Sequence, residues 1–140
     1  MRRTTAAVLL AAAALAAAGC GESDQDKAQT SVCDARDDIK QQVDKLKGVS
    51  ASSFDAGEVT GALSAIQSDL AKIRDARGDL REARREEIDS ADKAFSGQVD
   101  TALDQVKSNI GSGDAAATIT AAVQQLASGF EQAFARVDCS

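Results

Sequence analysis

The side chains that could do chemistry in this chain are three cysteines and 22 aspartates and glutamates, because the sequence contains no histidine. Histidine is the commonest general base and metal ligand, and it completes the serine–histidine and cysteine–histidine nucleophile pairs. No serine or threonine lies in a motif that supplies another base, and the glycines lack phosphate-loop spacing. The sequence therefore predicts a protein that is not an enzyme and that holds no metal or cofactor.

Cys20 stands directly behind a segment with the features of an export signal. The chain begins with Met1-Arg2-Arg3, continues as an unbroken apolar run over Ala6–Ala18, and reaches Cys20 through a single glycine. A cationic start, a short apolar run and small residues at a cleavage site are typical of a secretory signal peptide. A membrane-spanning helix needs about 20 apolar residues, so this run is too short to be a permanent anchor.

The sequence Ala17-Ala18-Gly19-Cys20 resembles the lipobox of bacterial lipoproteins. This resemblance implies that residues 1–19 are a signal peptide removed before Cys20, and that the Cys20 thiol carries a diacylglycerol with acyl chains such as palmitate. The mature protein is then extracytoplasmic and anchored to the outer face of the bacterial cell membrane. The family usually has leucine where this chain has Ala17. The alternative is an ordinary signal peptide, cleaved near Ala18, that leaves Cys20 as an unmodified thiol.

The same resemblance bears on the other two cysteines. With Cys20 lipidated, Cys33 and Cys139 remain, and they lie near the two ends of the mature domain. A single pair of cysteines in an exported domain favours a disulfide. Two free buried thiols are the alternative, and a redox pair is disfavoured because no C-x-x-C spacing occurs.

The charge of the chain limits its partners. Removal of Arg2 and Arg3 with the signal peptide leaves 14 basic residues against 22 acidic ones, a net charge of −8. A chain without a basic face is not expected to bind nucleic acid or to adsorb electrostatically to anionic lipid headgroups. The expected partners are the membrane, through the acyl chains on Cys20, and another protein of the cell envelope. A small-molecule ligand is not favoured.

Composition and periodicity predict an all-α domain, because proline is absent and alanine is abundant. Residues 20–30 are polar and aperiodic, which predicts a flexible acidic tether, with Ser31 opening the first helix of a domain over residues 31–140. Four apolar stripes at helical spacing follow. They comprise Val32, Ala35, Ile39, Val43 and Leu46; Val59, Leu63, Ile66, Leu70 and Ile73; Ile88, Ala91, Phe95, Val99, Leu103, Val106 and Ile110; and Ile119, Val123, Leu126, Phe130, Phe134 and Val137.

The number of helices depends on the segment around Gly78. Either Gly78 ends one helix and Asp79 caps the next, or one long helix runs through both stripes. In an up-and-down bundle the chain ends meet only when the number of helices is even, and a disulfide needs the Cα atoms of Cys33 and Cys139 within about 7 Å. The sequence therefore predicts an up-and-down four-helix bundle, with loops at about residues 48–54, 77–79 and 111–114.

Two further motifs are interpreted structurally. Arg77-Gly78-Asp79 is the tripeptide of integrin ligands, but a helix stop followed by a helix cap accounts for the same three residues. The charged run Leu80–Asp89 spaces Arg84 with Glu87, and Arg85 with Asp89, as helical neighbours that form weak ion pairs. A solvated helix face is favoured over a docking surface for this run.

The composition leaves two alternatives for the interior. Alanines allow close helix packing, with Phe54, Phe95, Phe130 and Phe134 filling the remaining space, or the helices enclose an apolar cavity for a lipid.

The domain also resembles in composition the small Ala-rich helical lipoproteins of high-GC Gram-positive bacteria, a resemblance that implies no functional residues. The predicted function is a non-enzymatic interaction or structural module at the cell envelope. The alternative function is a carrier or sensor that binds a small apolar ligand between its helices.

Overall fold

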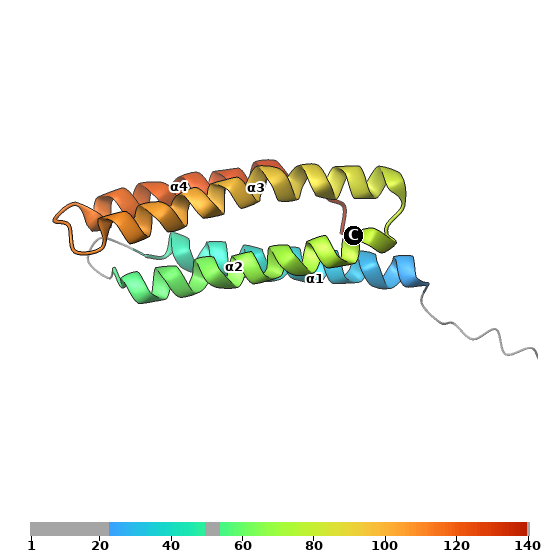
Figure 1. Cartoon of the computed structure of the whole chain (residues 1–140), viewed down its shortest axis with the longest axis horizontal. Helices are drawn as coiled ribbons and strands as arrows, with labels where there is room; N and C mark the ends of the chain where they lie inside the picture. The colour runs from blue at the N-terminus through green and yellow to red at the C-terminus, as the bar shows by residue number, and fades with distance from the viewer. Residues whose placement is uncertain (1–22, 50–53, 140) are drawn as a thin grey trace, which may run out of the picture.

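The computed structural model describes residues 23–49 and 54–139, which form four long helices and one short 3-10 helix (Figure 1). The long helices are α1 (Asp24–Lys47), α2 (Ala56–Ala76), α3 (Glu82–Asn109) and α4 (Ala115–Phe134), and the 3-10 helix η1 (Arg77–Asp79) joins α2 to α3. They run alternately up and down, and no strand occurs within the described ranges. The fold is the all-α four-helix bundle that the sequence predicts.

The bundle consists of two helical hairpins. α1 packs most extensively on α2, and α3 on α4, whereas the α2–α3 and α1–α4 contacts that join the hairpins are smaller. The connection through η1 lies at the end of the bundle where α1 begins (Figure 1). The two hairpins are therefore joined to each other by less extensive contacts than those that hold each hairpin together.

The predicted apolar stripes form the core. Every residue of the first, second and fourth stripes is buried, and so are the first six residues of the third. Ile110 is the exception, with 57% of its surface exposed. It follows the end of α3 at Asn109, so the helical period that predicted its burial no longer applies there.

The first helix begins earlier than the sequence predicts. α1 begins at Asp24, because Ser23 accepts a hydrogen bond from the backbone N–H of Asp26 and the Asp26 side chain returns one to Ser23, which makes a capping box. Ala28 is already buried against the core. The predicted tether over residues 20–30 is thus wrong from Asp24 onward, and Ser31 lies inside α1; residues 20–22 are outside the described ranges.

The joint between the hairpins is a full turn, as the four-helix prediction requires, but its cap differs from the expected one. Asp79 belongs to η1, and α3 begins at Glu82 without a side-chain cap. The guanidinium of Arg85 donates instead to the backbone carbonyls of Arg77, Gly78 and Leu80. These bonds tie the start of α3 to the backbone of the turn, in which the Arg77 carbonyl also accepts from the N–H of Leu80.

Candidate functional site

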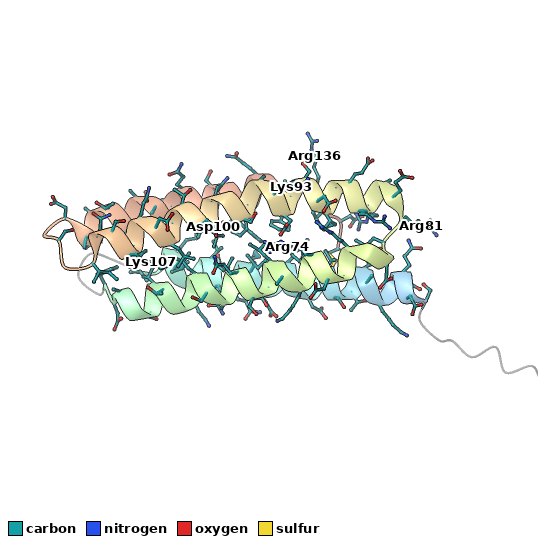
Figure 2. The ribbon with its side chains drawn as sticks, viewed as in Figure 1. Arg74, Arg81, Lys93, Asp100, Lys107 and Arg136 are labelled. Atoms are coloured by element: carbon teal, nitrogen blue, oxygen red, sulfur yellow. A yellow bond between two sulfur atoms is a disulfide. The ribbon has the colours of Figure 1, made fainter. Side chains whose placement is uncertain are left out.

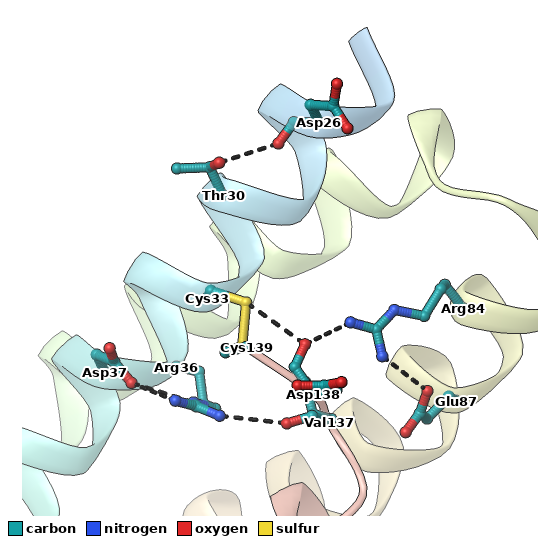
Figure 3. The surroundings of a disulfide bond; sticks show 10 residues. All are labelled: Asp26, Thr30, Cys33, Arg36, Asp37, Arg84, Glu87, Val137, Asp138 and Cys139. Carbon is teal, nitrogen blue, oxygen red and sulfur yellow. Dashed lines mark hydrogen bonds and ion pairs between the residues drawn. A yellow bond between two sulfur atoms is a disulfide. The ribbon is translucent and has the colours of Figure 1, made fainter. Parts of the chain in front are cut away.

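Two of the three predicted cysteine sites lie in the described part of the chain. Cys33 and Cys139 are joined by a disulfide with an S–S distance of 2.04 Å and a Cα–Cα distance of 5.6 Å (Figure 3). The bond links α1 of the first hairpin to the segment that follows α4 of the second. Cys20, the predicted lipid site, lies outside the described residues.

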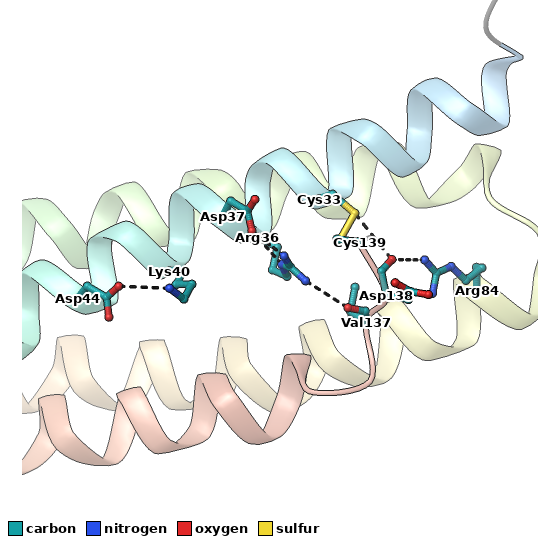
Figure 4. A network of polar contacts seen from close by, with 9 residues as sticks. All are labelled: Cys33, Arg36, Asp37, Lys40, Asp44, Arg84, Val137, Asp138 and Cys139. Atoms are coloured by element: carbon teal, nitrogen blue, oxygen red, sulfur yellow. Dashed lines mark hydrogen bonds and ion pairs between the residues drawn. A yellow bond between two sulfur atoms is a disulfide. The ribbon is translucent and has the colours of Figure 1, made fainter.

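The segment Ala135–Cys139, here called the C-terminal strap, is held by more than the disulfide. Arg36 on α1 donates to the carbonyl of Val137 at 3.2 Å, and Arg84 on α3 donates to the carbonyl of Asp138 (Figures 3 and 4). The Val137 side chain is buried. Helices from both hairpins therefore hold the strap, which closes one end of the bundle.

Polar side chains also cross the face between α2 and α3. The Arg74–Asp92 pair is the most buried of them, since the Asp92 side chain is only 5% exposed. Arg74 Nε lies 2.9 Å from Asp92 Oδ2. Oδ1 of Asp92 has no hydrogen-bond partner among the described residues. Three such contacts are arranged along this face: Gln67–Asp100, Arg74–Asp92 and Arg77–Asp89.

These contacts show which of the ion pairs predicted for the charged segment form in the structure. Arg77 pairs with Asp89, so the Arg77-Gly78-Asp79 tripeptide is part of the turn between the hairpins. The predicted ion pair of Arg84 with Glu87 forms at 3.2 Å. The predicted pair of Arg85 with Asp89 is wrong, because Arg77 takes Asp89 and Arg85 binds the carbonyls of the turn.

On α2, the buried Asp69 carboxylate accepts a hydrogen bond from the exposed Lys72 ammonium at 2.6 Å. That hydrogen bond, together with the negative charge of Asp69, raises the pKa of Lys72 above its usual 10.5. Because the folded-state pKa is raised, the stability linked to the Lys72 charge is present at neutral pH and is lost as the pH rises through that pKa.

A groove open to solvent runs along the junction of α3 and α4 and is here called the α3–α4 groove. It consists of two hollows, of about 240 and 540 Å³, that share Ala94 and Gln98. The larger hollow carries Glu86, Glu87 and Arg136 near the start of α3, and Figure 2 shows Arg136 projecting away from the bundle. The smaller hollow has only uncharged lining residues: Ala94, Gly97, Gln98, Thr101, Ala102, Gln105, Ala122, Gln125 and Leu126.

Gln98 and Gly129 meet where the two hollows join. The Gln98 amide lies against the α4 backbone at Gly129, and a Cβ atom at position 129 would overlap this amide. The Gln98 Oε1 atom is buried and has no hydrogen-bond partner among the described residues. Glycine at position 129 therefore allows the side chain of α3 to cross α4, at the cost of one unsatisfied acceptor.

The pairing of Gln98 with Gly129 does not follow from the sequence pattern. Gly48 and Gly111 follow the ends of α1 and α3, and the φ of 86° at Gly111 favours glycine, whereas Gly129 lies in the middle of α4. An isolated glycine inside a helical pattern is a signal of close approach by another group. A second signal was that α4 carries a single charged residue, Glu131.

The middle of the bundle is filled by aromatic rings. Phe95 lies edge-on to Phe130 and Phe134, at centroid distances of 5.4 and 5.8 Å, and the latter two rings are 5.1 Å apart. This packing agrees with the closed-core alternative of the sequence analysis at this level of the bundle.

Within residues 23–49 and 54–139, no group of three or more histidine, cysteine, aspartate or glutamate side chains is placed to hold a metal ion. Over the same ranges, no helix has the length and apolar character needed to cross a membrane. In comparisons with known proteins, the chain matches no family model, no curated protein and no solved structure.

Proposed function

We propose that this protein is a lipid-anchored, extracytoplasmic, non-enzymatic interaction module that binds another protein of the cell envelope through the α3–α4 groove. The observation that carries the proposal is the absence of charge from the smaller hollow, in a chain of which 27% of residues are charged. The centres of protein–protein interfaces are depleted of charged side chains, whereas solvated helix faces are not.

The Gln98 amide supports the same assignment. A buried acceptor without a donor destabilises a protein by about 1–3 kcal/mol. The last torsion of a glutamine side chain is soft, so a small rotation turns Oε1 toward a donor in the groove. A partner that supplies this donor would gain a hydrogen bond that the free bundle does not make.

The groove is tested by photo-crosslinking in cells. A photoreactive side chain at Gln125, which lines the groove, is expected to give a discrete crosslinked adduct, whereas one at Ser68, exposed on α2, is not. The same adducts from both positions would contradict the proposal.

Gly129→Ala should reduce the adduct formed at Gln125 by roughly tenfold, because the added methyl pushes Gln98 into the groove, and a poorly fitted contact costs about 1–3 kcal/mol. The helix itself should persist, since alanine is a better helix former than glycine. Gly61→Ala is the matched control, because a Cβ there meets no other atom and lies on α2. An undiminished adduct in the Gly129→Ala protein would show that the partner does not bind through the groove.

The anchor is tested independently. Cys20→Ser removes the only thiol to which the lipid can be attached in the proposed site, so the protein is expected to move from the membrane fraction to the soluble fraction. The double variant Cys33→Ser, Cys139→Ser is the control, and it should stay with the membrane. Retention of the Cys20→Ser protein in washed membranes would contradict the proposed lipid anchor at Cys20.

A further inference from the structure

We infer that two copies of this chain pair through the outward face of α3, in antiparallel directions and about a twofold axis that passes next to Gly97. The observation that carries the inference is a line of exposed residues with alternating charge, here called the α3 charge line. It recurs every seven residues as Glu86, Lys93, Asp100 and Lys107, and Figure 2 shows the last three of them spread along α3. A spacing of seven residues keeps side chains beside the line of contact between two paired helices.

Within one copy, the α3 charge line has few partners. Glu86, Lys93 and Lys107 form no ion pair among residues 23–49 and 54–139. Asp100 accepts a hydrogen bond at 2.9 Å from the side chain of Gln67, which carries no charge. The charges of the line are therefore available to a second molecule.

The α3 charge line is complementary to its own reverse. In an antiparallel pair, Glu86 lies opposite Lys107 of the second copy, Lys93 lies opposite Asp100 of the second copy, and the twofold axis repeats both contacts. A shift by seven residues in either direction places Lys93 opposite Lys107, or Glu86 opposite Asp100, so that like charges meet. A parallel pair about a twofold axis places each charge opposite itself. The pattern therefore selects the antiparallel direction and one register.

The residues beside the α3 charge line are small enough for a second helix to approach closely. The exposed small residues of this face are Ala83, Ser90, Ala94, Gly97, Thr101 and Ser108. A Cβ atom added at Gly97 would meet no other atom within 4 Å. Packed helices lie about 8–10 Å apart, and small side chains in the contact allow the shorter distances, at which flanking lysines reach carboxylates of the other helix. The same register places Ile110, which is 57% exposed, at the level of Ala83 of the second copy.

The other charges of α3 are compatible with this register. Asp104 lies at the level of Ser90 of the second copy, whose hydroxyl can donate to a carboxylate. Asp89 lies at the level of Asp104 of the second copy, and Arg77 of its own copy neutralises it. The charged residues from Glu82 to Arg85 lie at the level of Ser108–Gly111 of the second copy, which carry no charge.

The helices that flank α3 bring few free charges to this face. Arg74 of α2 is paired with the buried Asp92. On α4, Arg136 shares the larger hollow of the groove with Glu86 and Glu87, and Glu87 is paired with Arg84. No contacts join α1 to α3 within the described ranges, so the charges of α1 lie away from the pairing surface.

The inference depends neither on the lipid proposed at Cys20 nor on the proposed envelope partner. Ala94, Gly97 and Thr101 also line the smaller hollow of the α3–α4 groove. A second copy on this face therefore covers the α3 side of the groove, and it excludes a groove-bound protein from these residues.

The contact is tested by zero-length crosslinking of full-length protein. Unlabelled and isotope-labelled chains are mixed and treated with a water-soluble carbodiimide, which joins a lysine amine to a carboxylate only where the two groups touch. An adduct of Glu86 with Lys107 that contains one labelled and one unlabelled peptide is expected. These residues are about 32 Å apart along α3 of one copy, so the adduct cannot form within a single chain.

Charge reversal tests the register, with the dimer measured by sedimentation velocity. Lys93→Glu with Lys107→Glu makes the α3 charge line acidic throughout, and Glu86→Lys with Asp100→Lys makes it basic throughout. Each variant alone is expected to reduce the dimer association constant roughly tenfold or more, and an equal mixture of the two is expected to restore it. Circular dichroism checks that the helices persist.

Lys40→Glu with Lys45→Glu is the matched control, because it changes the net charge equally at exposed positions of α1. It is expected to leave the association constant unchanged. Unchanged association of both charge-line variants would overturn the inference, and so would mixed-isotope adducts that join only residues outside α3. All variants keep Cys20, so association through the N-terminal segment would be equal in every sample.

Discussion

Replacing both Cys33 and Cys139 by serine is expected to lower the free energy of unfolding by about 4–5 kcal/mol. The bond joins residues 106 positions apart, so it closes almost the whole domain into one loop. In the chain-entropy model, a loop of about 100 residues restricts the unfolded chain by about 4.7 kcal/mol. The folded state should keep its helices, because Arg36, Arg84 and the buried Val137 still hold the strap.

Urea unfolding followed by circular dichroism measures this effect. The wild-type protein should unfold at a lower urea concentration after reduction, with a midpoint close to that of the double variant. The double variant is its own control, since a reductant has no bond to break there and should leave its midpoint unchanged. Identical midpoints for the oxidised and reduced wild type would show that the unfolded chain gains little freedom when the bond is opened.

The architecture could be predicted because the residues buried by a helix recur in the sequence at the helical period. The five apolar residues of the second stripe, from Val59 to Ile73, recur at helical spacing along α2, and all five are buried in the bundle. The number of helices did not follow from periodicity, since the stripes on either side of Gly78 also fit one long helix. It followed from the requirement that Cys33 and Cys139 meet, which four antiparallel helices satisfy.

The polar contacts could not be predicted in the same way, because several partners compete for each charged group. Arg85 has an aspartate four residues away, at a spacing that stabilises helices by about 0.2–0.5 kcal/mol. In the bundle, Asp89 pairs with Arg77 from the turn, and Arg85 donates to the backbone carbonyls of the turn. Only the position of the turn relative to α3 decides this exchange, and local spacing carries no information about that position.

The Gln98–Gly129 contact was missed for a related reason. The two residues are 31 positions apart in the sequence, and nothing local shows that the glutamine of one helix crosses the glycine of another. The sequence did show a glycine inside a helical stripe and a nearly uncharged last helix. Together these mark a helix with an unusual neighbour, without identifying the neighbour.

Phe95→Ala is the second substitution for which a large loss is expected, about 3–5 kcal/mol of unfolding free energy. Phe95 has no exposed surface, and its ring contacts Phe130 and Phe134 from α4. Truncation removes the apolar contact area and both edge-on ring pairs, and it leaves a cavity between α3 and α4 that close-packed neighbours fill only in part. Denaturant unfolding of the oxidised protein measures the loss.

Phe54→Ala is the matched control, because Phe54 is only partly buried, at the edge of the core; it should cost clearly less than Phe95→Ala. The size of the second effect also depends on the first. A single domain is commonly stable by about 5–15 kcal/mol, so Phe95→Ala together with loss of the disulfide removes most of that margin. The Phe95→Ala protein is therefore expected to stay helical while oxidised and to lose most of its helical signal on reduction. If it stays fully helical with both cysteines reduced, either the rings or the disulfide contributes much less than the structure indicates, and the two separate urea titrations identify which.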